Sequence, residues 1–291
     1  MLTIPLVRES DASDERVREA FRDIKATLRV PLVSQIFQAW ATVPRFLDYA
    51  WRRFRPNVLA ASFIEQSRRI SGLAARVVSA WPGDDHGAAL RERNVSEADM
   101  LRMREISSMF NDLDCKLLAI AHAVRLALGG TQIGGGGISG PQHGGDKDRL
   151  SRDHRGLRLS LVDERDAPPR IRTVLEDIKS SLGLSLMPSE YRAIAAFPDW
   201  LEIWWKDCKA SLNAPRYAAL LREVDEAGVE AARALPYRLN LSDELLLRSE
   251  VTSDDRARIS RINDAFCEML PGLVITLAVA NRGLGQTTGV I

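Results

Sequence analysis

Two stretches that repeat each other indicate the fold of this chain: FQAWATVPRFLDYAW at residues 37–51 and YRAIAAFPDWLEIWW at residues 191–205. At an offset of 154 positions, Pro44 corresponds to Pro198 and Trp51 to Trp205, and upstream the triplet DIK occurs at 23–25 and again at 177–179. An internal repeat constrains the architecture before any single motif does. We therefore predict two related halves.

The composition is that of a globular protein without a strong charge bias. The chain has 291 residues, 45% of them hydrophobic, and a formal net charge of +1. This balance gives no electrostatic reason to expect a nucleic-acid or membrane partner. The N-terminal residues turn acidic early and lack the apolar segment of a signal peptide, so we expect a cytoplasmic protein. The three cysteines are far apart in sequence and suggest neither a disulfide framework nor a metal site.

A glycine-rich segment separates the two copies of the repeat. Nine of the nineteen glycines lie between Gly129 and Gly145. A phosphate-binding loop would need a preceding strand and a helix that opens on a Gly-Lys-Ser/Thr end, and both are missing here. The segment is typical of a linker. We predict a first helical repeat at 1–128, a linker at 129–159 and a second helical repeat at 160–291.

Both halves carry helical patterns. Apolar residues from Ile106 to Val124 recur at steps of three and four, after a capping sequence that begins at Ser96 and before Gly129. In the second half, Pro168-Pro169 can open a helix that Gly183 ends. The sequence predicts an all-α fold in which the two repeats form an intramolecular pseudo-dimer, with a site in the cleft between them.

Three polar residues could carry chemistry, and each also has an ordinary structural interpretation. Glu190 could be a helix N-terminal charge, but the repeat places Ile36 at the equivalent position, which favours an inward-facing carboxylate. Asn111 lies at the edge of an apolar helix face, where it could make an interhelical hydrogen bond. Glu65 could pair with Arg69 on a helix surface.

The chain resembles the group I haloacid dehalogenases, the non-stereospecific family that hydrolyses both enantiomers of 2-haloalkanoic acids. The resemblance covers nearly the whole chain. It is carried by the following segments, in this order: DIKATLRVP at 23–31, ATVPRFLDYAWRR at 41–53, FNDLDCKLL at 110–118, LSLVDERDA at 159–167 and SEYRAIAAFPDWLEI at 189–203.

The resemblance implies a cofactor-independent and metal-independent reaction in which a carboxylate deprotonates a water. The water then displaces halide at the α-carbon with inversion. The family's aspartate base corresponds to Glu190 in this chain, and the asparagine that positions the water corresponds to Asn111. The residues that the resemblance assigns to substrate binding are Ser189, Leu32, Gln35, Tyr191 and Glu65.

We therefore expect a hydrolase that acts on a small 2-haloalkanoic acid, with Glu190 and Asn111 as its catalytic residues. Two alternatives follow from the same residues. One is a related hydrolytic or proton-transfer reaction on another small carboxylic acid, and the other is a catalytically degenerate binding protein on the same fold. Burial of Glu190 separates the first two from the third. A homodimer is left open by the sequence.

Overall fold

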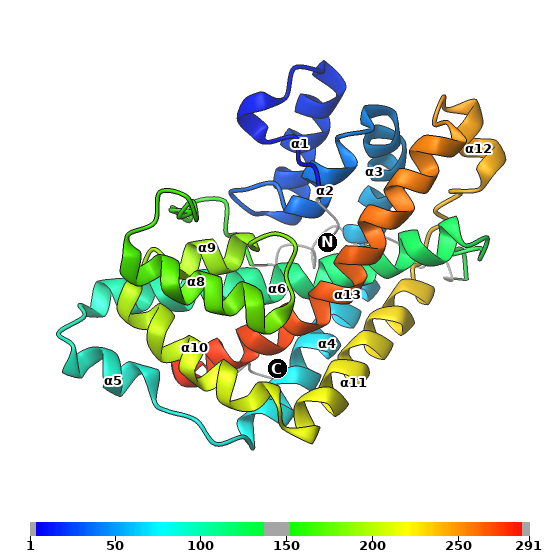
Figure 1. Ribbon diagram of the computed structural model, residues 1–291. Coiled ribbons are helices and arrows are strands. Elements are labelled where there is room, and N and C mark those ends of the chain that lie inside the picture. The colour runs from blue at the N-terminus through cyan, green and yellow to red at the C-terminus, as the bar shows by residue number, and fades with distance from the viewer. Residues whose placement is uncertain (1–3, 137–151, 287–291) are drawn as a thin grey trace.

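The computed structural model describes residues 4–136 and 152–286, and within these residues it contains helices and no strand, which confirms the all-α prediction (Figure 1). The first half begins with a short 3₁₀ helix, η1 (Glu9–Asp11). It continues with α1 (Glu15–Leu28), α2 (Gln35–Trp40), α3 (Pro44–Val58), α4 (Ala61–Ser79), α5 (His86–Glu92) and α6 (Glu97–Leu128). The second half contains α8 (Pro169–Leu182), α9 (Ser189–Ile194), α10 (Pro198–Leu212), α11 (Pro215–Arg233), α12 (Asp243–Arg248) and α13 (Ser253–Gly283).

The helices of the second half repeat those of the first. Helices α8 to α11 have the bounds of α1 to α4 shifted by 154 positions. For example, α1 begins at Glu15 and ends at Leu28, and α8 begins at Pro169 and ends at Leu182. A partly buried side-chain contact is duplicated as well. The indole of Trp51 donates to Asp23 at 2.7 Å, and the indole of Trp205 donates to Asp177 at 2.7 Å. The repeat found in the sequence is thus a repeat of structure.

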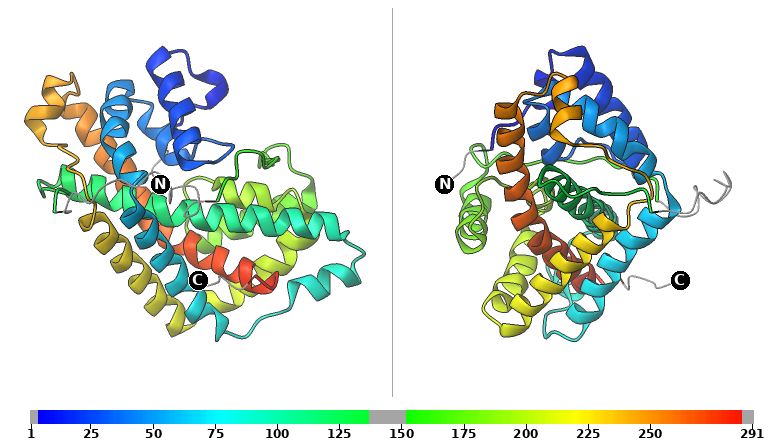
Figure 2. Two further views of the ribbon diagram at one scale, coloured as in Figure 1. Left: turned by 180° about the vertical axis from the view of Figure 1, so that it is seen from behind. Right: turned by 90° about the vertical axis from the view of Figure 1, so that its right-hand side faces the viewer.

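The two halves are intertwined around one pair of long helices. Helices α6 and α13 cross at the centre of the molecule, with α1 to α3 on one side and α8 to α10 on the other (Figures 1 and 2). The short helix of each half packs on the long helix of the other, α9 on α6 and α2 on α13. In the same way, α4 of the first half packs on α13, and α11 of the second half packs on α6. This arrangement is the predicted pseudo-dimer.

Local sequence signals place the helix ends. Ser96 caps α6 and accepts a hydrogen bond from the backbone N–H of Asp99 at 3.1 Å. Gly183 follows α8 with a φ of 62°, a left-handed conformation that glycine adopts without steric cost. Helix α9 begins at Ser189, after Pro188 at the cap position. The predicted linker at 129–159 includes residues 137–151, which lie outside the described residues.

Helix α13 is long and apolar enough to cross a membrane by length and composition alone, but 72% of that apolar window is buried inside the fold. Its composition is explained by its central position, where neighbouring helices cover it on most sides. The same applies to α6, in which the residues from Leu117 to Val124 are all buried. The two central helices therefore form the core against which the shorter helices pack.

Candidate active site

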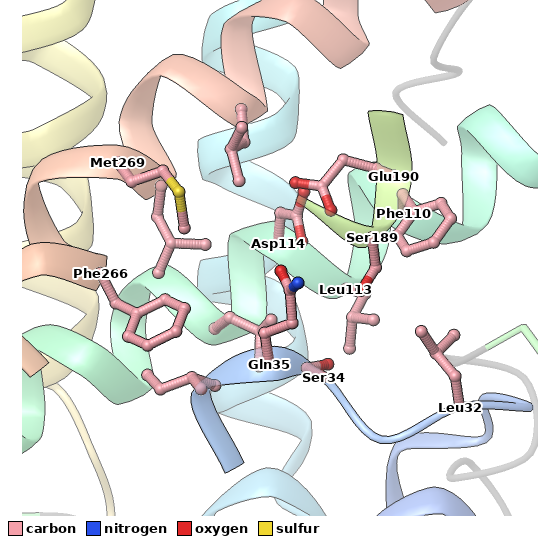
Figure 3. A pocket seen from close by; sticks show the side chains of 14 residues that line it. Leu32, Ser34, Gln35, Phe110, Leu113, Asp114, Ser189, Glu190, Phe266 and Met269 are labelled. Carbon is pink, nitrogen blue, oxygen red and sulfur yellow. The ribbon is translucent and has the colours of Figure 1, made fainter. Parts of the chain in front are cut away.

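A pocket lies where α6 crosses α13 (Figure 3). The N-terminal ends of α2, from the first half, and of α9, from the second half, also line it. Most of its lining side chains are apolar, and the polar ones come from the two short helices and from the middle of α6. The lining residues are Leu32, Ser34, Gln35 and Ile36 before and on α2, Phe110, Leu113, Asp114 and Leu117 on α6, Ser189 and Glu190 on α9, and Phe266, Met269, Leu270 and Leu273 on α13.

The walls of the pocket are copies of each other. The cap residues Ser96 of α6 and Thr252 of α13 are 156 positions apart, and at that spacing the residues of α6 that line the pocket match those of α13. The pairs are Phe110 with Phe266, Leu113 with Met269, Asp114 with Leu270, and Leu117 with Leu273. On the short helices Glu190 matches Ile36. The pocket thus has an acidic wall and an apolar wall built from equivalent positions.

Two buried carboxyl groups form the acidic wall. The side chains of Asp114 and Glu190 point toward each other from α6 and α9 and are within hydrogen-bonding reach (Figure 3). Asp114 is 2% exposed and Glu190 is 4% exposed. Burial raises the pKa of Glu190 to about 7. Burial, and then the neighbouring charge of Glu190, raise the pKa of Asp114 well above its ordinary value.

Several polar atoms of the pocket have no hydrogen-bond partner among the residues that the structure describes. They are the hydroxyl oxygen of Ser34, Oδ2 of Asp114 and Oε1 of Glu190, and all three are buried. The amide nitrogen of Gln35, by contrast, donates to the carbonyl oxygen of Met187 at 3.0 Å. A buried polar atom without a partner is costly. Three such atoms that converge on one pocket mark a place for a water or a polar ligand.

The pocket is narrow. The space that a water-sized sphere can occupy between its walls is about 20 Å³, which is room for about one water molecule. Of the lining side chains, Leu32 and Met269 are half-buried and the others are buried. These two side chains are the partly solvent-accessible residues of the lining.

A protein-family model described as "Halocarboxylic acid dehydrogenase DehI" matches residues 31–191, more than half of the chain. The chain belongs to the DehI family. The matched segment includes the pocket residues of α2, α6 and α9. This family thus shares the part of the chain that carries the acidic pair.

Named relatives describe the family more closely. An (R)-2-haloacid dehalogenase of Pseudomonas putida is 27% identical over 91% of this chain and 88% of its own length. A configuration-inverting 2-haloacid dehalogenase of Pseudomonas sp. (strain 113) is 25% identical over 90% of this chain and 91% of its own. A solved D-2-haloacid dehalogenase mutant with D-2-CPA superposes with a TM-score of 0.86 at 27% identity, and covers 97% of this chain and 96% of its own.

These comparisons confirm the prediction of a hydrolytic dehalogenase of the 2-haloacid type and correct the subgroup. The sequence analysis assigned the chain to the non-stereospecific group I. That assignment is wrong, because the DehI-family relatives with this fold include (R)-2-haloacid and D-2-haloacid dehalogenases, which are named for one enantiomer.

The structure brings four of the predicted site residues together in the pocket of this DehI-family fold: Glu190, Ser189, Leu32 and Gln35. Glu190 is buried, as the comparison with Ile36 predicted. Ser189 precedes it on α9, while Gln35 occupies the matching position on α2. Their roles in catalysis or substrate binding stay predictions.

Two predicted substrate-binding residues lie elsewhere. Glu65 is on the exposed face of α4, with 63% of its side chain accessible, and pairs with Arg69 at 2.6 Å. Tyr191 faces away from the pocket, because its hydroxyl bonds to the hydroxyl of Thr276 at 2.8 Å and its ring packs on Trp204. Neither side chain is among the residues that line the pocket.

The residue of α6 that lies beside Glu190 in the pocket is Asp114, which the sequence analysis missed, and not Asn111. The amide nitrogen of Asn111 donates to the hydroxyl of Ser71 on α4 at 2.6 Å, and Asn111 does not line the pocket. The α6 side chain next to Glu190 is Asp114. A signal for it was present, because Asp114 follows Phe110 by four positions and precedes Leu117 by three, on the apolar face of α6.

Among the described residues, Asp114 and Glu190 are not part of a cluster of potential metal ligands. Over residues 4–136 and 152–286, no three His, Cys, Asp or Glu side chains gather as metal ligands would. The three cysteines are buried and unpaired. The two carboxyl groups of this pocket can transfer protons to and from a bound water or ligand, or attack a bound ligand as nucleophiles.

Proposed function

We propose that this protein hydrolyses small (R)-2-haloalkanoic acids to 2-hydroxy acids of the opposite configuration, with Glu190 as the general base. The observation that carries the proposal is the carboxylate of Glu190. It is buried in the pocket, and its Oε1 has no hydrogen-bond partner among the described residues. The names of the relatives supply the substrate class and the enantiomer. Because Glu190 is buried, the alternative of a degenerate binding protein, which requires a solvent-facing carboxylate, is disfavoured.

The reaction balances with one water and one base. The water oxygen forms a bond to the α-carbon as the carbon–halogen bond breaks, and the halide leaves with the electron pair of that bond. One proton of the water passes to Glu190. Since burial places the pKa of Glu190 at about 7, the group is basic enough to take this proton and still releases it near neutral pH. A base whose pKa lies near the working pH is the most effective one.

Glu190 could in principle attack the α-carbon itself. The resulting ester would be hydrolysed by water at its carbonyl carbon, which leaves the α-carbon inverted, so this route and direct attack by water give the same configuration. Relatives of this chain are configuration-inverting, which fits both routes. The destination of the oxygen from labelled water separates them. The room for about one water between the walls is in keeping with a water held next to the base.

The rest of the pocket fits a short acid. The apolar wall around Ile36 and Leu270 would cover the alkyl group and the halogen, and the hydroxyls of Ser34 and Ser189 are donors for the carboxylate of the substrate. Among the described lining residues there is no cation, so neutral donors would carry this recognition. Because the space between the walls holds about one water, lining side chains have to move to admit the substrate.

The test is halide release from each enantiomer of 2-chloropropionate. We expect release from the (R) enantiomer, formation of (S)-lactate, and a loss of about 10²- to 10⁴-fold in kcat for Glu190→Gln, the range for removal of a general base. Glu190→Asp keeps the charge but shortens the side chain, so partial activity is expected. Full activity of Glu190→Gln would reject Glu190 as the base. No release from either enantiomer would reject the substrate class.

A further inference from the structure

The acidic wall of the pocket poses a problem of charge. Asp114 and Glu190 are both buried and their carboxyl groups contact each other. Two ionised carboxylates in contact repel each other strongly, and the described lining residues include no cation that would offset the repulsion. The pair therefore retains one proton when its first proton has left. A proton on one carboxyl also turns it into a hydrogen-bond donor for the other.

The positions of the two residues decide which one keeps the proton. Glu190 is in the first turn of α9, where its carboxylate accepts a hydrogen bond from its own backbone N–H, a contact that stabilises its anion. Asp114 is in the interior of α6, where the backbone N–H groups are used within the helix. Asp114 is also the less exposed of the two. The anion is thus favoured on Glu190 and the acid on Asp114.

Other titratable groups near the pair do not compensate its charge. On α9, Tyr191 follows Glu190 in the sequence, and burial raises the pKa of its phenol well above the ordinary value. On α6, Cys115 adjoins Asp114, and burial likewise raises the pKa of its thiol. Lys116 is ion-paired with Asp112 at 2.6 Å. The side chains that α2 and α13 contribute to the pocket do not ionise.

We propose that Asp114 is a positioning residue that acts in its protonated form, donating a hydrogen bond to the ionised Glu190 and so fixing this carboxylate toward the attacking water. This role rests on the proposed function of Glu190 and assigns the pair an order: Asp114 holds the proton throughout, and Glu190 accepts and releases the proton of the water. The enzyme is active while the pair carries one proton. With two protons on the pair, Glu190 is protonated and cannot act as a base. With no proton on the pair, Asp114 cannot donate a hydrogen bond, and the enzyme is inactive in both states.

A neutral carboxylic acid has nearly the shape of a carboxamide, and both can donate one hydrogen bond to Glu190. Asp114→Asn should therefore preserve the function of Asp114 and abolish its titration. Leu270 occupies the equivalent position on the apolar wall, so Asp114→Leu introduces a side chain that this fold already holds in a matching environment. It removes the donor. The exposed Glu105 on the same helix offers a charge-removal control, Glu105→Gln.

The test is the pH dependence of kcat/KM for (R)-2-chloropropionate, which reports the ionisation of groups in the free enzyme. We expect a bell-shaped profile for the wild type and for Glu105→Gln. Asp114→Asn should keep activity of the same order and its acid limb but lose the alkaline limb. Asp114→Leu should lose about 10- to 100-fold, as expected for a hydrogen bond to a charged group, with its acid limb displaced to higher pH because the donor that favours ionised Glu190 is absent. An inactive but folded Asp114→Asn protein, or one that retains the alkaline limb, would overturn the proposal.

Infrared difference spectroscopy tests the proton independently of turnover. Wild-type protein minus Asp114→Asn at pH 8 should show the carbonyl band of a protonated carboxylic acid, and wild type minus Glu105→Gln should not. If the wild type releases no halide but shows this band, the proton assignment stands and the proposed function fails. If it releases halide and the band is absent, the proton assignment is overturned while the proposed function stands.

Discussion

Replacement of Glu190 by glutamine should make the protein more stable at alkaline pH while it removes activity. In the folded protein burial raises the pKa of Glu190 to about 7, from an ordinary value of 4.5. Glutamine has nearly the same shape and does not ionise, so the variant avoids the cost of a buried charge. The residue that serves the chemistry is thus a source of instability in the fold.

The pKa difference sets the size and the pH range of this effect. In the unfolded chain Glu190 ionises near pH 4.5, and in the folded chain near pH 7. Between these values the folded protein binds more protons than the unfolded chain, so the free energy of unfolding falls as the pH rises. At 1.36 kcal/mol per pH unit, the interval corresponds to about 3 kcal/mol, lost in full above pH 7. Below pH 5 the difference between wild type and Glu190→Gln should be under about 1 kcal/mol.

The assay is urea denaturation of both proteins between pH 4.5 and 8, with Glu105→Gln as a control in which an exposed carboxylate is removed from α6. Glu190→Gln should exceed the wild type by about 3 kcal/mol at pH 8 and converge with it at low pH. The control should follow the wild type throughout. Equal stability of Glu190→Gln and wild type at pH 8, or a difference that stays constant with pH, would refute the reasoning about the buried charge.

Three further substitutions test the placement of the other residues. Asn111→Ala should lower the free energy of unfolding by about 1–3 kcal/mol, because it removes the 2.6 Å hydrogen bond to Ser71, with little change in kcat/KM; a loss as large as that of Glu190→Gln would return Asn111 to the catalytic machinery. Glu65→Gln should change the stability by less than about 1 kcal/mol, because its pair with Arg69 is exposed, and a raised KM would contradict this placement. Met269→Ala enlarges the pocket that Met269 lines and should favour 2-chlorobutanoate over 2-chloropropionate by roughly tenfold relative to wild type; an unchanged ratio of kcat/KM would show that Met269 does not contact the substrate.

The internal repeat made much of the fold predictable. A shared pattern at an offset of 154 predicted equivalent helices in both halves, and the helix bounds recur at that offset from α1 to α4. It also predicted that Glu190 faces inward, since the equivalent Ile36 is a core residue. These inferences succeeded because they depend on local patterns and on one comparison within the chain.

The partner of Glu190 could not be identified in the same way. Asn111 and Asp114 are three positions apart on α6, which turns their side chains about 60° from each other around the helix. Which of them faces α9 is set by how α6 crosses α13, a long-range contact. The sequence resemblance assigned the positioning of the water to Asn111, the asparagine of the FNDLDC segment. The packing of α6 places Asp114 there, and with it a second buried carboxyl group beside Glu190.

A single-turnover reaction in ¹⁸O-labelled water, with enzyme in excess over (R)-2-chloropropionate, tests most directly that water attacks the α-carbon with Glu190 as its base. The account predicts (S)-lactate that carries ¹⁸O in its 2-hydroxyl group from the first turnover, with no label in Glu190. Unlabelled hydroxyl in the first-turnover lactate, or ¹⁸O in the Glu190 carboxylate, would show that Glu190 is the nucleophile and would contradict the account.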